Sequence, residues 1–121
     1  MDTPDVLDLP DAAAFEAWLG SHHDDRSEVH LRIARAGAAH RTLSITDALD
    51  VALCHGWIDS VRRRGDEEHY VQRYSPRRRG SSWSERNIAR AGELIAAGRM
   101  REPGRRALEA GTGRAAPARP R

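Results

Sequence analysis

The chain has 121 residues, 39% of them hydrophobic and 31% charged, and it carries a formal net charge of +2 at pH 7. These values are typical of one folded domain with a modest core and exclude an intrinsically disordered chain. No apolar run approaches the roughly 18 residues of a membrane-spanning helix, and the acidic first residues lack the basic and then apolar order of a signal peptide. Because Cys54 is the only cysteine, no internal disulfide can form, and we expect a cytoplasmic protein.

The N-terminal part of the chain predicts a helix and then a strand. The helix follows Pro10 and is capped by Asp11, because apolar residues recur there with helical spacing: Ala14, Phe15, Trp18 and Leu19. From Glu28 to Arg35 apolar and polar residues alternate, which predicts a strand with one buried face. The run 22–26 holds histidines and aspartates without the spacing of a helical metal site, so we interpret it as a solvated loop.

The stretch from Ile45 to His55 predicts a central helix capped by Ser44, because apolar residues occur on almost every side of it. Asp50 lies within this stretch, and a carboxylate in such surroundings needs a partner, for which we expect an arginine. Cys54 and His55 are adjacent, but neighbouring helical residues point about 100° apart and do not form a nucleophile and base pair. We therefore interpret Cys54 as a buried structural residue and His55 as a helix-end residue.

An antiparallel hairpin is predicted directly after Gly56. In its first strand, Trp57, Asp59 and Val61 share one face, while Ile58 and Ser60 share the other. The run 64–67 reads as a turn, and a second strand covers 68–75 before Pro76 breaks it.

Two helices complete the predicted fold. Ser84 caps the first, whose apolar face is formed by Ile88, Ala91, Leu94 and Ile95, and Pro103 opens a final short helix. From Gly111 onward no apolar period remains, so we expect one domain over 1–110 and a disordered Gly/Ala/Pro/Arg tail over 111–121. The expected fold class is α+β, with a small antiparallel sheet of about three strands packed by three to four helices.

Several stretches that follow one another in a consistent order carry a family resemblance: 48–59, 72–77, Trp83-Ser84, Asn87 and Gly98-Arg99-Met100. Over about Leu7 to Ala110 they resemble the YdeI/OmpD-associated (OmdA-like) family of bacterial proteins, often labelled bacteriocin-protection proteins. The resemblance implies a role in tolerance of bacteriocins or antimicrobial peptides, or in envelope stress, and it implies no reaction. Members of that family continue into a further helical region, so we expect the tail of this chain to be a truncated or frame-shifted end.

The first functional hypothesis is a binding module for a small anionic or peptide ligand. Seven residues of the hairpin and of the following helix start are its candidates, and together they would surround one polar and aromatic pocket: Trp57, Asp59, Arg73, Arg77, Trp83, Ser84 and Asn87. Arginines and a helix N-terminus suit an anion, and tryptophans supply flat apolar walls. In the structural alternative, both tryptophans belong to the core, and Asp59 with Arg73 forms a cross-strand salt bridge.

Two other functions stay open. Nucleic-acid binding would use the clusters 62–64 and 77–79, with Tyr70 and Tyr74 for stacking, although a net charge of +2 is small for such a protein. An enzyme would use Asp59 or Asp50 as acid or base, with Asn87 or Ser84 orienting the substrate. No nucleophile elbow, phosphate loop, metal motif or cofactor motif occurs in the sequence, so we expect neither a metal nor a cofactor.

Overall fold

The structure is a computed structural model that describes residues 5–78 and 81–113 of the chain. This part of the chain forms four helices and a four-stranded mixed sheet, which confirms the α+β class. In chain order the elements are β1 (Val6–Leu7), α1 (Ala12–His22), β2 (Val29–Ala34), α2 (Ile45–Cys54), β3 (Trp57–Arg64), β4 (His69–Pro76), α3 (Glu85–Ala96) and α4 (Glu102–Thr112). The sheet has one strand more than expected, because the two residues of β1 are too few to show an alternating pattern.

The strand order in the sheet is β1-β2-β4-β3. β1 pairs in parallel with β2, whereas β4 pairs antiparallel with both β2 and β3. The predicted hairpin is therefore confirmed as β3 and β4, and β3 forms one edge of the sheet. A β-bulge interrupts β3 between Asp59 and Arg62, where two residues of β3 lie opposite Arg73 of β4.

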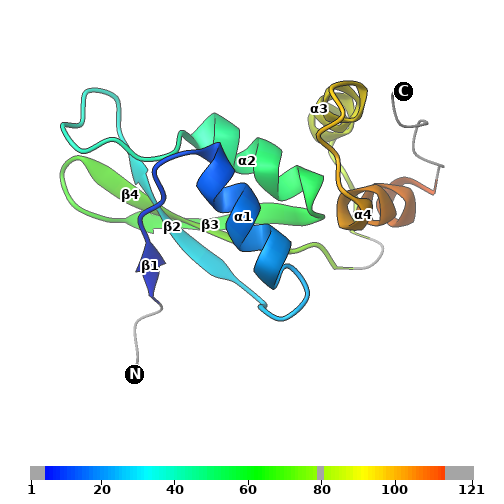
Figure 1. Ribbon diagram of the computed structural model, residues 1–121, viewed down its shortest axis with the longest axis horizontal. Coiled ribbons are helices and arrows are strands. Elements are labelled where there is room, and N and C mark those ends of the chain that lie inside the picture. The colour runs from blue at the N-terminus through cyan, green and yellow to red at the C-terminus, as the bar shows by residue number, and fades with distance from the viewer. Residues whose placement is uncertain (1–4, 79–80, 114–121) are drawn as a thin grey trace.

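Two hydrophobic clusters hold the fold together, and α2 contributes to both. In the first, α1 and α2 pack on one face of the sheet through Phe15, Leu19, Val29, Leu31, Ile33, Leu43, Ala48, Val51, Ala52, Trp57, Tyr70 and Tyr74. The second joins the end of α2 to α3 and α4 through Leu53, Cys54, Trp83, Ala91, Leu94, Ile95, Met100 and Leu108. Figure 1 shows the same division, with α1 and α2 over the sheet and α3 and α4 together at one end.

The three predicted helix caps are all present. Asp11 Oδ1 accepts a hydrogen bond from the Ala14 amide at 2.9 Å. Ser44 Oγ and Ser84 Oγ each accept one at 3.1 Å, from the amides of Asp47 and Asn87. These side chains satisfy amides that have no partner inside their own helix, which is why α1, α2 and α3 begin where they do.

Gly56 forms the corner between α2 and β3. Its φ of 77° lies in the left-handed region that favours glycine, as expected for a helix C-terminus. α4 packs closely here, since the Arg101 amide donates to Cys54 O at 3.0 Å and a Cβ on Gly56 would lie 2.8 Å from Pro103 O. The corner therefore holds α4 against the end of α2.

α4 continues to Thr112, two residues beyond the boundary expected at Ala110. Residues 114–121 of the expected tail lie outside the described residues. Among the described helices, none has the length and apolar character needed to cross a membrane.

Candidate functional site

A groove of about 600 Å³ lies between α2, α3 and the edge strand β3. α2 lines it with Ile45, Thr46, Leu49 and Asp50, β3 with Asp59 and Arg62, and α3 with Arg86, Asn87, Ala89, Arg90 and Glu93. A short apolar patch from α2 thus faces charged and amide side chains from α3 and β3. Such a mixture of apolar wall and convergent polar groups is typical of a binding site.

One arginine of the groove, Arg90, is paired with the buried carboxylate of Asp50. Arg90 donates from Nε to Asp50 Oδ1 at 2.8 Å and from Nη2 to Asp50 Oδ2 at 2.6 Å, and its Nη1 lies 2.9 Å from Glu93 Oε2. Asp50 is only 4% exposed, so the arginine partner expected from the sequence is confirmed. The hydrogen bonds to Asp50 raise the pKa of Arg90. This pair fixes α3 on α2 and leaves no net charge for a ligand.

A second arginine is held in place while its charge stays uncompensated. Arg62 Nε donates to Gln72 Oε1 at 3.2 Å, and the guanidinium lies 4.3 Å from the ring centroid of Tyr70. Gln72 is itself buried, and its amide donates to the carbonyls of Ser60 and Val61 in the bulge, each at 3.3 Å. The bulge, the buried amide and the aromatic ring therefore preorganise Arg62 on the β3 side of the groove.

Asp59 and Arg86 supply a further carboxylate and guanidinium to the groove. In the part of the chain that the structure describes, neither side chain forms a hydrogen bond or an ion pair. Asn87 lies beside Arg86 in the first turn of α3, where its backbone amide is bonded to the cap and its side chain lines the groove. These side chains are available to a ligand because the fold does not use them.

The structure does not bring the seven predicted residues into one pocket. Asp59 and Asn87 meet in the groove, but Trp57 is 1% exposed and belongs to the core. Arg73 lies on the other face of the sheet, where its Nε donates to Glu28 Oε1 at 2.8 Å and its Nη1 to Ser60 Oγ at 3.0 Å. Because Asp59 pairs with Tyr74, adjacent Arg73 points to the opposite face. The salt bridge between Asp59 and Arg73, which the structural alternative predicted, therefore does not form.

Arg77, Trp83 and Ser84 form a separate structural unit. The Arg77 guanidinium stacks on Trp83 at 3.9 Å from the ring centroid, and burial lowers the pKa of Arg77. Trp83 Nε1 donates to Ala107 O at 3.2 Å, which ties the start of α3 to α4. The Ser84 hydroxyl accepts the capping hydrogen bond of α3. These three residues therefore stabilise the second cluster and do not line the groove.

Cys54 and His55 have the structural character that the sequence favoured. Burial raises the pKa of the Cys54 thiol to about 11, so the nucleophilic thiolate is scarce at neutral pH. His55 is 5% exposed, and its Nε2 lies 2.9 Å from Glu16 Oε1. Arg101 Nε also donates to Glu16 Oε1, at 2.8 Å, so this cluster joins α1 to the start of α4.

The aromatic residues proposed for nucleic-acid stacking are not accessible. Tyr74 is fully buried, and Tyr70 is buried between the guanidinium groups of Arg35 and Arg62. Arg79 lies outside the described residues. The arginine clusters therefore lack the stacking platform that single-stranded nucleic-acid binding requires.

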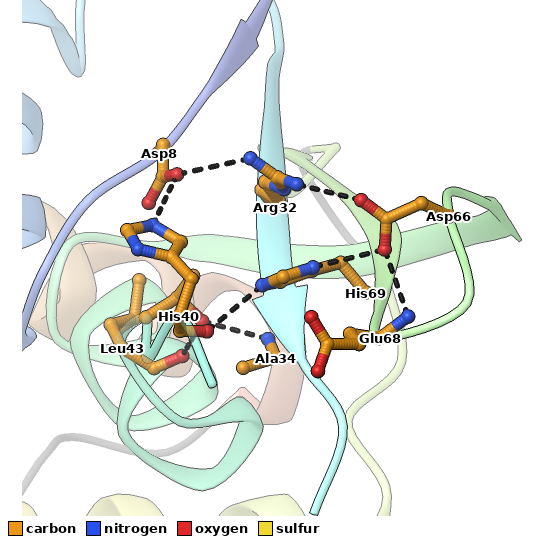
Figure 2. A network of polar contacts seen from close by, with 9 residues as sticks. Asp8, Arg32, Ala34, His40, Leu43, Asp66, Glu68 and His69 are labelled. Carbon is orange, nitrogen blue, oxygen red and sulfur yellow. Dashed lines mark hydrogen bonds and ion pairs between the residues drawn. The ribbon is translucent and has the colours of Figure 1, made fainter. Parts of the chain in front are cut away.

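A second polar network lies at the far end of the sheet, where it joins β1, β2 and the β3–β4 turn (Figure 2). Asp8 contacts His40 at 2.7 Å and Arg32 at 3.4 Å, and Arg32 also donates to Asp66 at 2.6 Å. His69 places Nδ1 3.0 Å from Asp66 and Nε2 2.9 Å from His40 O, so only the doubly protonated ring can donate to both. No set of three potential metal ligands gathers here or elsewhere among the described residues, and we interpret the network as structural.

Arg86 and Arg90 were missed from the sequence although a signal for them exists, and Arg62 was considered only within the cluster 62–64 for nucleic-acid binding. Arg86 and Arg90 are four residues apart, so they share a face of α3 next to its apolar face. Arg62 carries no such signal, because the bulge that turns it toward the groove leaves no mark in the sequence.

A comparison with protein families gives one match. The family model described as a domain of unknown function (DUF8412) matches residues 7–107, which includes every residue that lines the groove and, except for Leu108, every buried residue of the two clusters. No curated protein and no solved structure matches the chain. The chain belongs to the DUF8412 family of domains of unknown function.

Proposed function

We propose that this protein is a binding module whose groove between α2, α3 and β3 takes the anionic group of a small molecule or peptide. The observation that carries the proposal is the pair Arg62 and Arg86. Both line the groove, and neither is paired with a carboxylate in the described part of the chain. A guanidinium offers a planar set of donors that fits a carboxylate or phosphate.

The charges of the groove support an anion with a polar neighbour. Arg90 contacts both Asp50 and Glu93, and Arg99 Nη1 lies 3.9 Å from Asp50 Oδ2, so these two arginines balance the two carboxylates. Arg62 and Arg86 then remain as cations, and Asp59 is a carboxylate that forms no hydrogen bond or ion pair within the described chain, although it interacts electrostatically with Arg77. A ligand that combines an anionic group with a hydrogen-bond donor complements this arrangement, and peptides have both.

A peptide ligand also agrees with the resemblance to the YdeI/OmpD-associated family, whose label implies tolerance of bacteriocins or antimicrobial peptides. We include that role, in a bacterial cytoplasm, in the proposal. The cytoplasmic location is supported by the single buried cysteine, because a fold without an internal disulfide does not depend on an oxidising compartment.

The test is a titration of the full chain with succinate and, separately, with inorganic phosphate at low salt, followed by amide NMR shifts. We expect shifts that cluster at Arg62, Arg86 and Asn87. Arg86→Ala removes one charge-assisted contact and should weaken binding about tenfold. Arg106→Ala, which removes an exposed arginine of α4 outside the groove, is the matched control and should leave the affinity unchanged.

Equal affinities for the Arg86 and Arg106 variants would show that the anion binds through net charge alone. Shifts spread over the whole surface, without a cluster in the groove, would equally contradict the proposal.

A further inference from the structure

The backbone of β3 presents an unpaired edge next to the groove. β3 is the outermost strand of the sheet, and β4 is its only strand partner among the described residues. The Arg77 amide donates to Gly56 O, at the start of the β3–β4 ladder, and the Arg35 amide donates to Glu68 O, at the end of the β2–β4 ladder. These two bonds determine which residue pairs of each ladder are hydrogen-bonded, because hydrogen-bonded and non-hydrogen-bonded pairs alternate. Accordingly, Tyr70, Gln72 and Tyr74 direct their backbone groups toward β2, away from β3.

The alternation determines which groups of β3 point outward. Asp59, Arg62 and Arg64 lie opposite Tyr74, Gln72 and Tyr70, so their amides and carbonyls point away from β4. Among the described residues no backbone or side-chain group bonds to these outward amides and carbonyls. The amide and carbonyl of Arg62 thus point away from the sheet, while its side chain lines the groove.

We propose that the ligand of the groove is an extended acidic peptide segment that adds to β3 as a fifth strand. The inference rests on the proposed anion-binding function and names the class of ligand for the same site. Strand addition gives affinity through main-chain hydrogen bonds and specificity through alternate side chains.

The side-chain positions explain why the segment is acidic. A peptide residue opposite Arg62 projects to the same face of the sheet as the Arg62 side chain, and therefore into the groove lined by Arg86 and Asn87. The residue two positions along lies opposite Arg64 on the same face. Two acidic residues at i and i+2 consequently complement two arginines of β3, and the first also meets the cations of the groove.

The bulge limits how far the peptide can pair. Ser60 and Val61 break the regular alternation, and Val61 is 62% exposed. Regular pairing therefore covers only the end of β3 from Arg62 to Arg64. A short segment is sufficient, and a long apolar strand of another protein gains no extended ladder here.

The probe is the peptide acetyl-Thr-Val-Glu-Thr-Glu-Val-Thr-amide, added to the full chain. We expect saturable binding and about tenfold slower hydrogen exchange at the amides of Arg62 and Arg64. The control peptide carries N-methyl groups on both glutamate amides, which keeps both charges and removes two main-chain hydrogen bonds. It should bind about tenfold more weakly and give no protection.

Charge complementarity is tested by a swap. Arg86→Glu should weaken the glutamate peptide about tenfold and strengthen the same peptide with lysine at both glutamate positions. Because Arg86 is exposed and its side chain forms no hydrogen bond or ion pair within the described chain, the variant should fold like the parent, which a circular dichroism melt verifies.

The outcomes separate the two proposals. Succinate binding in the groove together with equal affinities for the parent and N-methylated peptides would leave anion binding standing and overturn strand addition. Protection of the same amides without peptide, increasing with protein concentration, would show that a second copy occupies the edge and would also overturn it. Absence of binding by every anion and peptide would remove both proposals.

Discussion

His55 shows at the scale of one residue how burial stabilises a single protonation state. Its ring is enclosed at the end of α2, where His23 lies 6.1 Å away between ring centroids and Glu16 2.9 Å away. Burial lowers the pKa of His55, although Glu16 acts in the opposite direction. The neutral ring is therefore the form that fits the folded protein.

The sign of the resulting pH dependence follows from that direction. A histidine with a lowered folded-state pKa contributes fully above its unfolded value near 6.5, and this contribution is lost as the pH falls. The free energy of unfolding should decrease between about pH 7.5 and 5.5 more steeply in the parent than in His55→Gln. Urea titrations at several pH values measure it.

Glu16→Gln serves as the companion variant. It removes the group that opposes the lowered pKa of His55, so it should extend the loss of stability to lower pH. Parallel pH profiles for the parent and His55→Gln would show that His55 does not control this dependence.

Individual residues also mark the limit of what the sequence could predict about the site. The burial of Asp50 and its arginine partner followed from an apolar helix with one carboxylate. The pairing of Asp59 with Arg73 did not form, because the two side chains lie on opposite faces of the hairpin. Facing alternates at every residue, so a shift of one position in register is enough to separate two predicted partners.

At the scale of elements, the corner at Gly56 determines how α4 joins the rest of the fold. α2, β3 and α4 meet there, and both the positive φ of Gly56 and its lack of a side chain are needed. The first requirement is conformational and the second is steric. Substitution of Gly37, which has a positive φ but no close neighbour, separates the two effects.

Gly56→Ala should destabilise the protein by about 3 kcal/mol or more, because its Cβ would press against Pro103 O in addition to the left-handed strain. Gly37 has a φ of 83° and open space around its Cβ position. Gly37→Ala should therefore lose only the conformational part, about 1 kcal/mol. Chemical denaturation gives both values, and equal losses would show that the contact with α4 is not strained.

Elements with local signals were predictable, and elements defined by distant partners were not. The side-chain caps of α1, α2 and α3 and the β3–β4 hairpin are encoded within a few residues, and the structure confirms them. β1 exists only because Val6 and Leu7 lie beside His30 and Leu31 of β2. Two residues carry no period of their own, so only the assembled sheet reveals this strand.

At the scale of the whole molecule, the two hydrophobic clusters depend on the same helix. α2 directs Val51 and Ala52 into the cluster over the sheet, and Leu53 and Cys54 into the cluster with α3 and α4. The buried pair of Asp50 and Arg90 adds a second tie between α2 and α3. Loss of one cluster therefore destabilises the helix on which the other cluster packs.

Leu94→Ala tests this dependence, because Leu94 is buried in the second cluster only. The truncation should cost about 2–4 kcal/mol and shift the whole unfolding transition. Far-ultraviolet circular dichroism and tryptophan fluorescence should give coincident curves in denaturant, both in the parent and in the variant. A fluorescence transition that precedes the loss of circular dichroism would show that the clusters unfold separately.

The strand order also has a consequence for synthesis on the ribosome. β2 and β3 do not pair with each other, and both depend on β4, which is the last strand of the sheet to be translated. Until β4 emerges, β2 can pair only with the two residues of β1, and its other edge has no strand partner. The nascent chain therefore carries unpaired strand edges through most of its translation. The sheet is completed only when β4 inserts between β2 and β3, which have been synthesised before it.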